Sequence, residues 1–121
     1  MVRNESEMWY YLKKKTPQIK WTRIENTSHF GTPDLLGYNK NKTFFTVELK
    51  VTKRNKLKFS PHQLAFHIRH SKNSFILTMQ LVDEVMKLYE GNQIESLATS
   101  GLKLEPICEG LEDCIKKLEG L

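Results

Sequence analysis

Residues 31–51, GTPDLLGYNKNKTFFTVELKV, contain two runs of apolar, β-branched and aromatic residues on either side of the polar turn NKNK. Such runs, separated by a few turn-forming residues, are typical of two antiparallel strands joined in a hairpin. We therefore expect residues 33–38 to pair with residues 43–51. The second strand carries an acid and a base, Glu48 and Lys50, where a purely structural strand could be apolar throughout.

The alternation of side chains along a strand places these two charged residues on one face. A loop of residues 39–43 predicts a ladder that pairs Tyr38 with Phe44, Leu36 with Thr46, and Asp34 with Glu48. The carboxylates of Asp34 and Glu48 are then directly opposite each other, with their Cβ atoms about 5 Å apart.

Two carboxylates this close repel each other in a half-buried sheet unless a cation lies between them. Mg²⁺ binds oxygen ligands, commonly one or two carboxylates with water and substrate phosphate. The hairpin would offer Asp34, Glu48 and the backbone carbonyl of Leu49, with Lys50 beside them to orient or deprotonate an attacking water. The pattern favours a centre that hydrolyses phosphodiesters. An ordinary hairpin with a solvent-facing Glu48–Lys50 ion pair remains the alternative.

The rest of the chain predicts helices and strands around this hairpin. A cap at Asn4 begins a helix that Pro17 ends, and Ser60 begins a second helix that runs to about His70. Residues 52–58 form a basic loop before the second helix. The spacing of apolar residues predicts strands at 18–25 and 74–79, and helices at 82–90, closed by Gly91, and at 111–118. This order predicts an α/β or α+β fold about one mixed sheet.

Length and composition indicate one domain. The 121 residues, 39% of them hydrophobic, suit a single core. No apolar run approaches the roughly 20 residues that cross a bilayer, and the first residues lack the apolar stretch of a secretory peptide. We therefore expect a cytoplasmic protein with no membrane partner, and a domain this small also suits a phage protein acting in a host cell. Cys108 and Cys114 have no companions at zinc-site spacing, so reduced thiols are expected.

The charges are distributed unevenly along the chain. Residues 1–72 contain 15 Lys and Arg and 5 Asp and Glu, whereas residues 73–121 contain 4 and 9. A basic surface of this kind favours a phosphate-rich partner such as nucleic acid, with the acidic part turned away. A solvated lysine-rich surface is the alternative, since 15 of the 19 cations are Lys.

Pro33-Asp34, the hairpin and Glu48-Leu49-Lys50 together resemble the PD-(D/E)XK nuclease superfamily. The chain is most similar to the branch of archaeal-type Holliday junction resolvases and VRR-NUC domains, in which a basic loop and a helix bearing Gln follow the second strand. Here that helix is SPHQLAFHIRH. The resemblance implies a restriction-endonuclease-like αβββαβ core with a central mixed sheet. It covers about residues 5–90 of a single domain, 1–121, and leaves residues 91–121 as a C-terminal extension.

The resemblance implies roles for the residues that match the motif. Asp34 and Glu48 would be metal ligands, with the carbonyl of Leu49, and Lys50 would be the catalytic lysine. The implied cofactor is Mg²⁺, for which Mn²⁺ would substitute.

Two further site residues have a competing role as helix caps. Glu7 would be the acid that the first helix directs at the metal, although Glu5 competes for that role and Glu7 also completes the cap of Asn4. Gln63 would face the active site, and it also completes the cap of Ser60.

Several basic residues are expected to contact the DNA backbone. His29 precedes the Pro-Asp step and is a candidate for touching the scissile strand. His67 and His70 are at helical spacing, where phosphate contact or surface exposure is expected rather than a metal pair. The densest basic run, which would position the backbone without reading sequence, contains Lys53, Arg54, Lys56 and Lys58.

These features predict a metal-dependent DNA endonuclease selective for branched DNA, such as a Holliday junction or a flap. We expect a homodimer, because a junction needs two incisions and one domain supplies one site. Two alternatives stay open. One is a sequence-specific homing or restriction-like endonuclease of the same superfamily, and the other is a non-catalytic DNA-binding protein on a nuclease fold.

Overall fold

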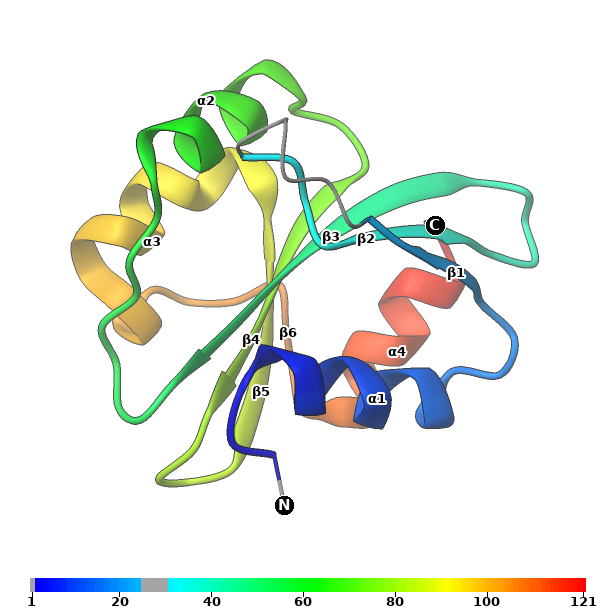
Figure 1. The fold of residues 1–121 in the computed structure, drawn as a ribbon, viewed down its shortest axis with the longest axis horizontal. Coiled ribbons are helices and arrows are strands. Elements are labelled where there is room, and N and C mark those ends of the chain that lie inside the picture. The colour runs from blue at the N-terminus through cyan, green and yellow to red at the C-terminus, as the bar shows by residue number, and fades with distance from the viewer. Residues whose placement is uncertain (1, 25–30) are drawn as a thin grey trace.

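A computed structural model describes residues 2–24 and 31–121 and shows a six-stranded mixed sheet with helices on both faces (Figure 1). The strands are in chain order across the sheet, and β3 and β4 are parallel while the other described neighbours are antiparallel. The α+β fold expected from the sequence is therefore confirmed. The strands are β1 (Lys20–Arg23), β2 (Leu35–Tyr38), β3 (Phe44–Thr52), β4 (Ser74–Gln80), β5 (Val85–Glu90) and β6 (Cys108–Glu109).

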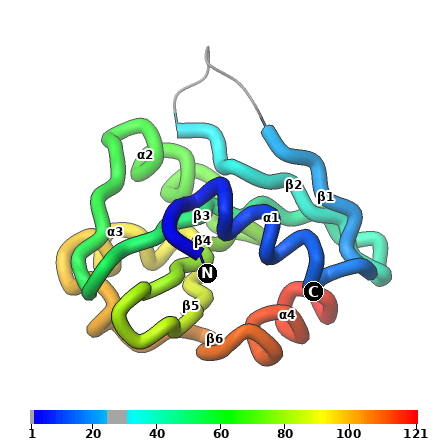
Figure 2. Tube along the Cα trace, turned by 60° about the horizontal axis from the view of Figure 1, so that its bottom comes forward, coloured from blue at the N-terminus to red at the C-terminus, as the bar shows by residue number. Residues whose placement is uncertain are grey.

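The helices form two layers, one on each face of the sheet. Figures 1 and 2 both show α1 and α4 close together and apart from α2 and α3. Within the described chain, no helix combines the length and the apolar character needed to cross a bilayer. The helices are α1 (Glu5–Lys15), α2 (Pro61–Arg69), α3 (Ile94–Ser100) and α4 (Leu111–Glu119), with 3₁₀ turns η1 (Gly91–Gln93) and η2 (Gly101–Lys103).

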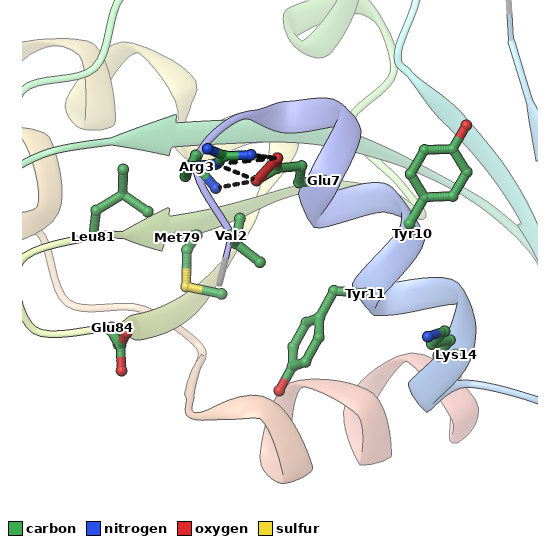
Figure 3. A pocket seen from close by; sticks show the side chains of 9 residues that line it. All are labelled: Val2, Arg3, Glu7, Tyr10, Tyr11, Lys14, Met79, Leu81 and Glu84. Atoms are coloured by element: carbon green, nitrogen blue, oxygen red, sulfur yellow. Dashed lines mark hydrogen bonds and ion pairs between the residues drawn. The ribbon is translucent and has the colours of Figure 1, made fainter.

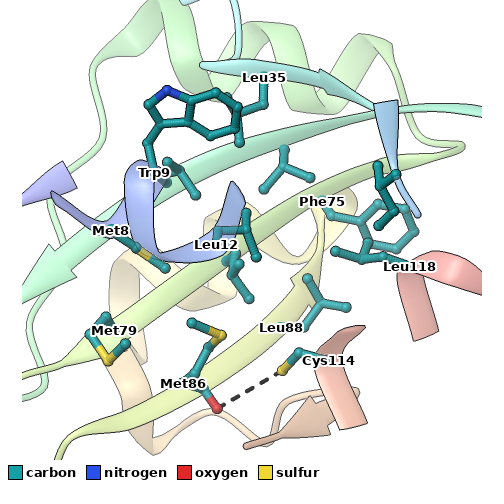
Figure 4. Close-up of a cluster of buried hydrophobic side chains, with 14 of the residues drawn as sticks. Met8, Trp9, Leu12, Leu35, Phe75, Met79, Met86, Leu88, Cys114 and Leu118 are labelled. Carbon is teal, nitrogen blue, oxygen red and sulfur yellow. Dashed lines mark hydrogen bonds between the residues drawn. The ribbon is translucent and has the colours of Figure 1, made fainter. Parts of the chain in front are cut away.

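Each face of the sheet has its own hydrophobic core. The α1/α4 face buries the odd-numbered residues of β3 with side chains such as Trp9, Leu12 and Leu118 (Figure 4). The α2/α3 face has a smaller core that includes Ile76 and Tyr89. Glu48 and Lys50 are even-numbered residues of β3, so they point to the α2 side.

The first helix and the hairpin form as the sequence predicts. The side chain of Asn4 accepts a hydrogen bond from the backbone N–H of Glu7, and α1 ends just before Thr16. Residues 18–25 were expected to form a strand; β1 is shorter, Lys20–Arg23, and residues 25–30 lie outside the described part. The hairpin has the predicted register, with Leu36 opposite Thr46 and Tyr38 opposite Phe44.

The prediction of a helix at residues 82–90 is wrong. These residues turn tightly and return as β5, which pairs antiparallel with β4. Met86 and Leu88 pack in the core under α1 and α4, whereas Tyr89 packs on the opposite face. A strand buried on both faces has apolar residues that also match helical spacing, which explains the error.

The last thirty residues complete both faces of the sheet. Helix α3 and η1 pack beside α2, β6 extends the sheet at β5, and α4 covers the other face next to α1. The side chain of Asn39, in the hairpin turn, donates a hydrogen bond of 2.9 Å to the backbone carbonyl of Leu118 in α4. The helix predicted at residues 111–118 is thus present and is tied to the hairpin.

Candidate active site

The acidic pair lies where β2 begins beside the middle of β3. The ladder between these strands starts with Leu35 opposite Val47, so Asp34 is one step before it, on the side of Glu48. The Oδ2 atom of Asp34 accepts a hydrogen bond of 2.7 Å from the backbone N–H of Leu49. This bond fixes the Asp34 carboxyl group against β3, next to Glu48.

Glu48 is a buried acid whose charge is poorly compensated. Its side chain is only 3% exposed, and burial raises its pKa to about 9, with a further contribution from the charge of Asp34. Lys50 opposes this shift. The Oε2 atom accepts a hydrogen bond from Gln63, but no described residue donates one to Oε1. A buried carboxylate oxygen without a donor, next to a second carboxyl group, is suited to a cation.

Lys50 is held on the same face as Glu48 by two contacts from the start of α2. Its Nζ atom donates a hydrogen bond of 3.2 Å to Oε1 of Gln63 and lies 5.0 Å from the centre of the Phe59 ring. The ring and the amide hold the ammonium group on this face of β3, where its charge lowers the pKa of Glu48. Phe59 was not expected at the site, and its only sequence signal is its position next to the Ser-Pro helix start.

Gln63 completes the helix cap and also contacts the candidate site. Its backbone N–H donates to Oγ of Ser60, and its Oε1 accepts from the Ser60 backbone N–H at 3.0 Å. The same side chain donates through Nε2 to Oε2 of Glu48 at 3.0 Å. The two roles considered from the sequence are therefore compatible, because the side-chain amide accepts from Ser60 through Oε1 and donates to Glu48 through Nε2.

The structure places the two acids of α1 differently. Glu7 forms an ion pair with Arg3 at 2.9 Å, and both line a pocket of about 550 Å³ between α1 and the β4–β5 turn (Figure 3). Glu5 is the acid of α1 whose charge helps to raise the pKa of Glu48. Of the two acids, Glu7 is thus paired with Arg3, whereas the charge of Glu5 acts weakly on Glu48.

The predicted DNA contacts have different surroundings. His29 lies outside the described residues. His67 was expected near the surface but is fully buried, with Nδ1 2.8 Å from Oγ of Ser74, so its side chain cannot reach a phosphate in this structure. His70 is exposed and stacks on Phe66. The basic run lies in the exposed loop between β3 and α2: Lys53, Arg54, Lys56 and Lys58.

The residues present fit a hard divalent cation that takes only part of its ligands from protein. The Asp34 carboxyl group is held against the backbone N–H of Leu49, beside the Glu48 carboxyl group, whose Oε1 has no donor among the described residues. In the described ranges, no three Asp, Glu, His or Cys side chains come together as a metal cage. Mg²⁺ commonly keeps several waters and uses one or two carboxylates, so a pair of acids is sufficient.

Comparison with known proteins supports the fold. No protein-family model matches the chain, and no curated protein sequence matches it either. Among solved structures, a Holliday junction resolvase from the archaeon Archaeoglobus fulgidus, Hjc, is similar with a TM-score of 0.57 and 12% identity over 74% of each chain. A VRR_NUC domain is similar with a TM-score of 0.53 and 22% identity over 81% of this chain and 97% of that one. The protein therefore has the restriction-endonuclease-like fold of the two groups that its sequence resembles.

Proposed function

We propose that the protein is a metal-dependent DNA endonuclease that cuts branched DNA. The observation that carries this proposal is the buried Glu48 carboxyl group, with a donor-free oxygen, beside Asp34 and Lys50. A purely structural strand gains nothing from an acid whose pKa is raised to about 9. The similarity to a Holliday junction resolvase supports DNA as the substrate.

The chain supplies a site that can bind, orient and stabilise charge. A divalent cation, Mg²⁺ or Mn²⁺, held by Asp34, Glu48 and the Leu49 carbonyl would lower the pKa of a bound water and offset the phosphate charge. Lys50, oriented by Gln63, is placed to stabilise the negative charge that develops on the phosphoryl oxygens as the P–O bond breaks. Gln63 also fixes the rotamer of Glu48.

The DNA backbone is proposed to lie along the loop between β3 and α2. The four exposed cations of this loop follow directly after the strand that carries Glu48 and Lys50. Phosphate contacts of this kind position the duplex without reading its sequence. We also propose that two copies act together, because two strands must be cut to resolve a junction.

The test is cleavage of labelled four-way junction, flap and linear duplex in parallel, with Mg²⁺, Mn²⁺ or EDTA. Asp34→Asn and Lys50→Ala should abolish cutting, whereas Lys103→Ala, an exposed lysine on η2, should leave it intact. Metal-dependent cutting of linear duplex at one defined site, with junctions ignored, would instead indicate a sequence-specific endonuclease.

A second measurement separates catalysis from binding. Calorimetry should detect Mg²⁺ or Mn²⁺ binding to the wild type and weaker binding to Asp34→Asn. DNA binding without metal binding or cleavage would contradict the nuclease proposal and point to a non-catalytic DNA-binding protein.

A further inference from the structure

The sheet face that carries Glu48 continues onto an aromatic row at the far end of the hairpin. The strand register aligns three residues across β1, β2 and β3, with Lys20 opposite Tyr38 and Tyr38 opposite Phe44. The rings of Tyr38 and Phe44 are 4.4 Å apart between centroids, at an angle of 42°. We call these three residues the aromatic row.

The aromatic row is open to solvent. Phe44 is 60% exposed, and Lys20 is also exposed. Neither ring belongs to the two hydrophobic cores of the described chain. Figure 1 shows that the tip of the hairpin extends away from α2 and α3.

The aromatic row lies on the same face of β3 as the candidate active site. Side chains 44, 46 and 48 share this face, so Phe44 and Glu48 are separated by four residues, or about 13 Å along the strand. The row Thr22–Leu36–Thr46 lies between them. A nucleic-acid strand whose phosphate reaches Glu48 and Lys50 can therefore continue along the sheet to the two rings.

The charge around the aromatic row suits nucleic acid. Strands β1 and β2, the hairpin turn and β3 as far as Val47 contain no Asp or Glu. Lys40 and Lys42 are exposed in the turn, and Lys20 flanks Tyr38. Exposed aromatic rings among cations are the features that bind single-stranded nucleic acid, because bases stack on the rings and phosphates pair with the cations.

A protein partner fits this surface less well. A stable interface buries about 800 Å² on each partner, and one aromatic side chain supplies about 150–250 Å². The apolar side chains here are Leu36, Tyr38 and Phe44, of which Leu36 and Tyr38 are already partly buried. The row is large enough for one or two bases.

We propose that the aromatic row stacks an unpaired base of the DNA strand that is cut. This inference rests on the proposed nuclease function and narrows its substrate. DNA with a single-stranded arm beside the cut, such as a flap or a fork, would use the row, whereas a fully paired four-way junction offers no free base there.

The experiment measures binding in EDTA, so that it does not depend on hydrolysis. Fluorescence anisotropy compares labelled oligothymidine with an abasic strand of the same length, for the wild type, Phe44→Leu, Phe44→Trp and Val82→Ala. Val82 is 64% exposed in the turn that follows β4, so Val82→Ala controls for loss of an exposed apolar side chain elsewhere.

We expect Phe44→Leu to weaken oligothymidine binding by about 5- to 140-fold, the range for loss of one stacked base. Phe44→Trp should bind like the wild type, Val82→Ala should be unchanged, and all four proteins should bind the abasic strand equally. Equal binding of oligothymidine by Phe44→Leu and the wild type would overturn the proposal. Sedimentation of Phe44→Leu gives a second test. A change from dimer to monomer in this variant would also overturn the proposal, because the aromatic row would then be a contact between two copies of the chain. If these binding results hold but no metal supports cleavage of any DNA, the nuclease proposal alone fails.

Discussion

Replacing Glu48 by Gln should make the stability of the protein nearly independent of pH between pH 7 and pH 8.5. Burial and the charge of Asp34 raise the pKa of Glu48 from its ordinary value of 4.5 to about 9. Between these two values the folded protein holds a proton that the unfolded chain has lost. The free energy of unfolding of the wild type therefore falls as the pH rises through this window.

The size of the effect follows from the proton count. One extra proton in the folded state corresponds to about 1.4 kcal/mol for each pH unit. Because Asp34 and Glu48 interact, the proton belongs to the pair. The wild type should lose about 2 kcal/mol between pH 7 and pH 8.5, above the range in which histidines titrate. In Glu48→Gln, the amide remains neutral and its oxygen can keep the hydrogen bond from Gln63.

Urea unfolding at both pH values in EDTA measures this difference. Glu5→Gln is the matched control, because it removes an exposed acid that contributes only a minor part of the shift and should retain most of the slope. Saturating MgCl₂ should flatten the slope of the wild type and of Glu5→Gln, since both keep Asp34 and Glu48 and metal binding requires the ionised carboxylates. A wild type with no slope in EDTA, or a Glu48→Gln variant with the same slope, would refute the view that Glu48 is buried with a proton.

Three further predictions concern α2 and its surroundings. Ser60→Ala should lower the free energy of unfolding by about 1 kcal/mol. It should preserve cleavage, because the Ser60 backbone N–H still bonds to Gln63. Gln63→Ala, by contrast, should lower both the free energy of unfolding and the cleavage rate. Gly91→Ala should lower the free energy of unfolding by about 1–3 kcal/mol, because the new Cβ would lie 2.7 Å from Nδ1 of His67. Gly120→Ala is the control, since its Cβ would have its nearest contact at 3.2 Å, and urea unfolding should show a smaller loss. Burial lowers the pKa of His67 to about 4, so the free energy of unfolding decreases as the pH falls below about 6.5. His67→Gln should reduce the decrease between pH 6.5 and pH 5 by about 1.5 kcal/mol, measured by urea unfolding at both pH values. An unchanged dependence on pH in this variant would contradict the lowered pKa of His67.

Local signals were sufficient to predict the hairpin and the ends of two helices. The register around Tyr38 and Phe44 follows from the length of the turn, and the caps at Asn4 and Ser60 follow from short side chains that bond to nearby backbone. The strand at β5 was missed because its burial depends on partners that are distant in sequence. Apolar residues on both faces remove the alternation that identifies a strand.

The candidate site was predictable where one strand carries it and less so where helices contribute. Glu48 and Lys50 share a face through strand geometry alone. Glu5 and Glu7, by contrast, point about 160° apart around a helix, so the rotation of α1 and the pairing of Glu7 with Arg3 decide which of the two charges acts on Glu48. His67 was misplaced for the same reason, since helical spacing does not show which side of α2 faces the sheet.

The side chain of Gln63 makes the geometry of the candidate site depend on the docking of α2. The amide that completes the first turn of α2 is also the group that aligns Lys50 and holds Glu48. A chain in which this helix has not yet docked has a mobile lysine and an unsupported acid. Any loss of this first helical turn would therefore release Lys50 and Glu48 together.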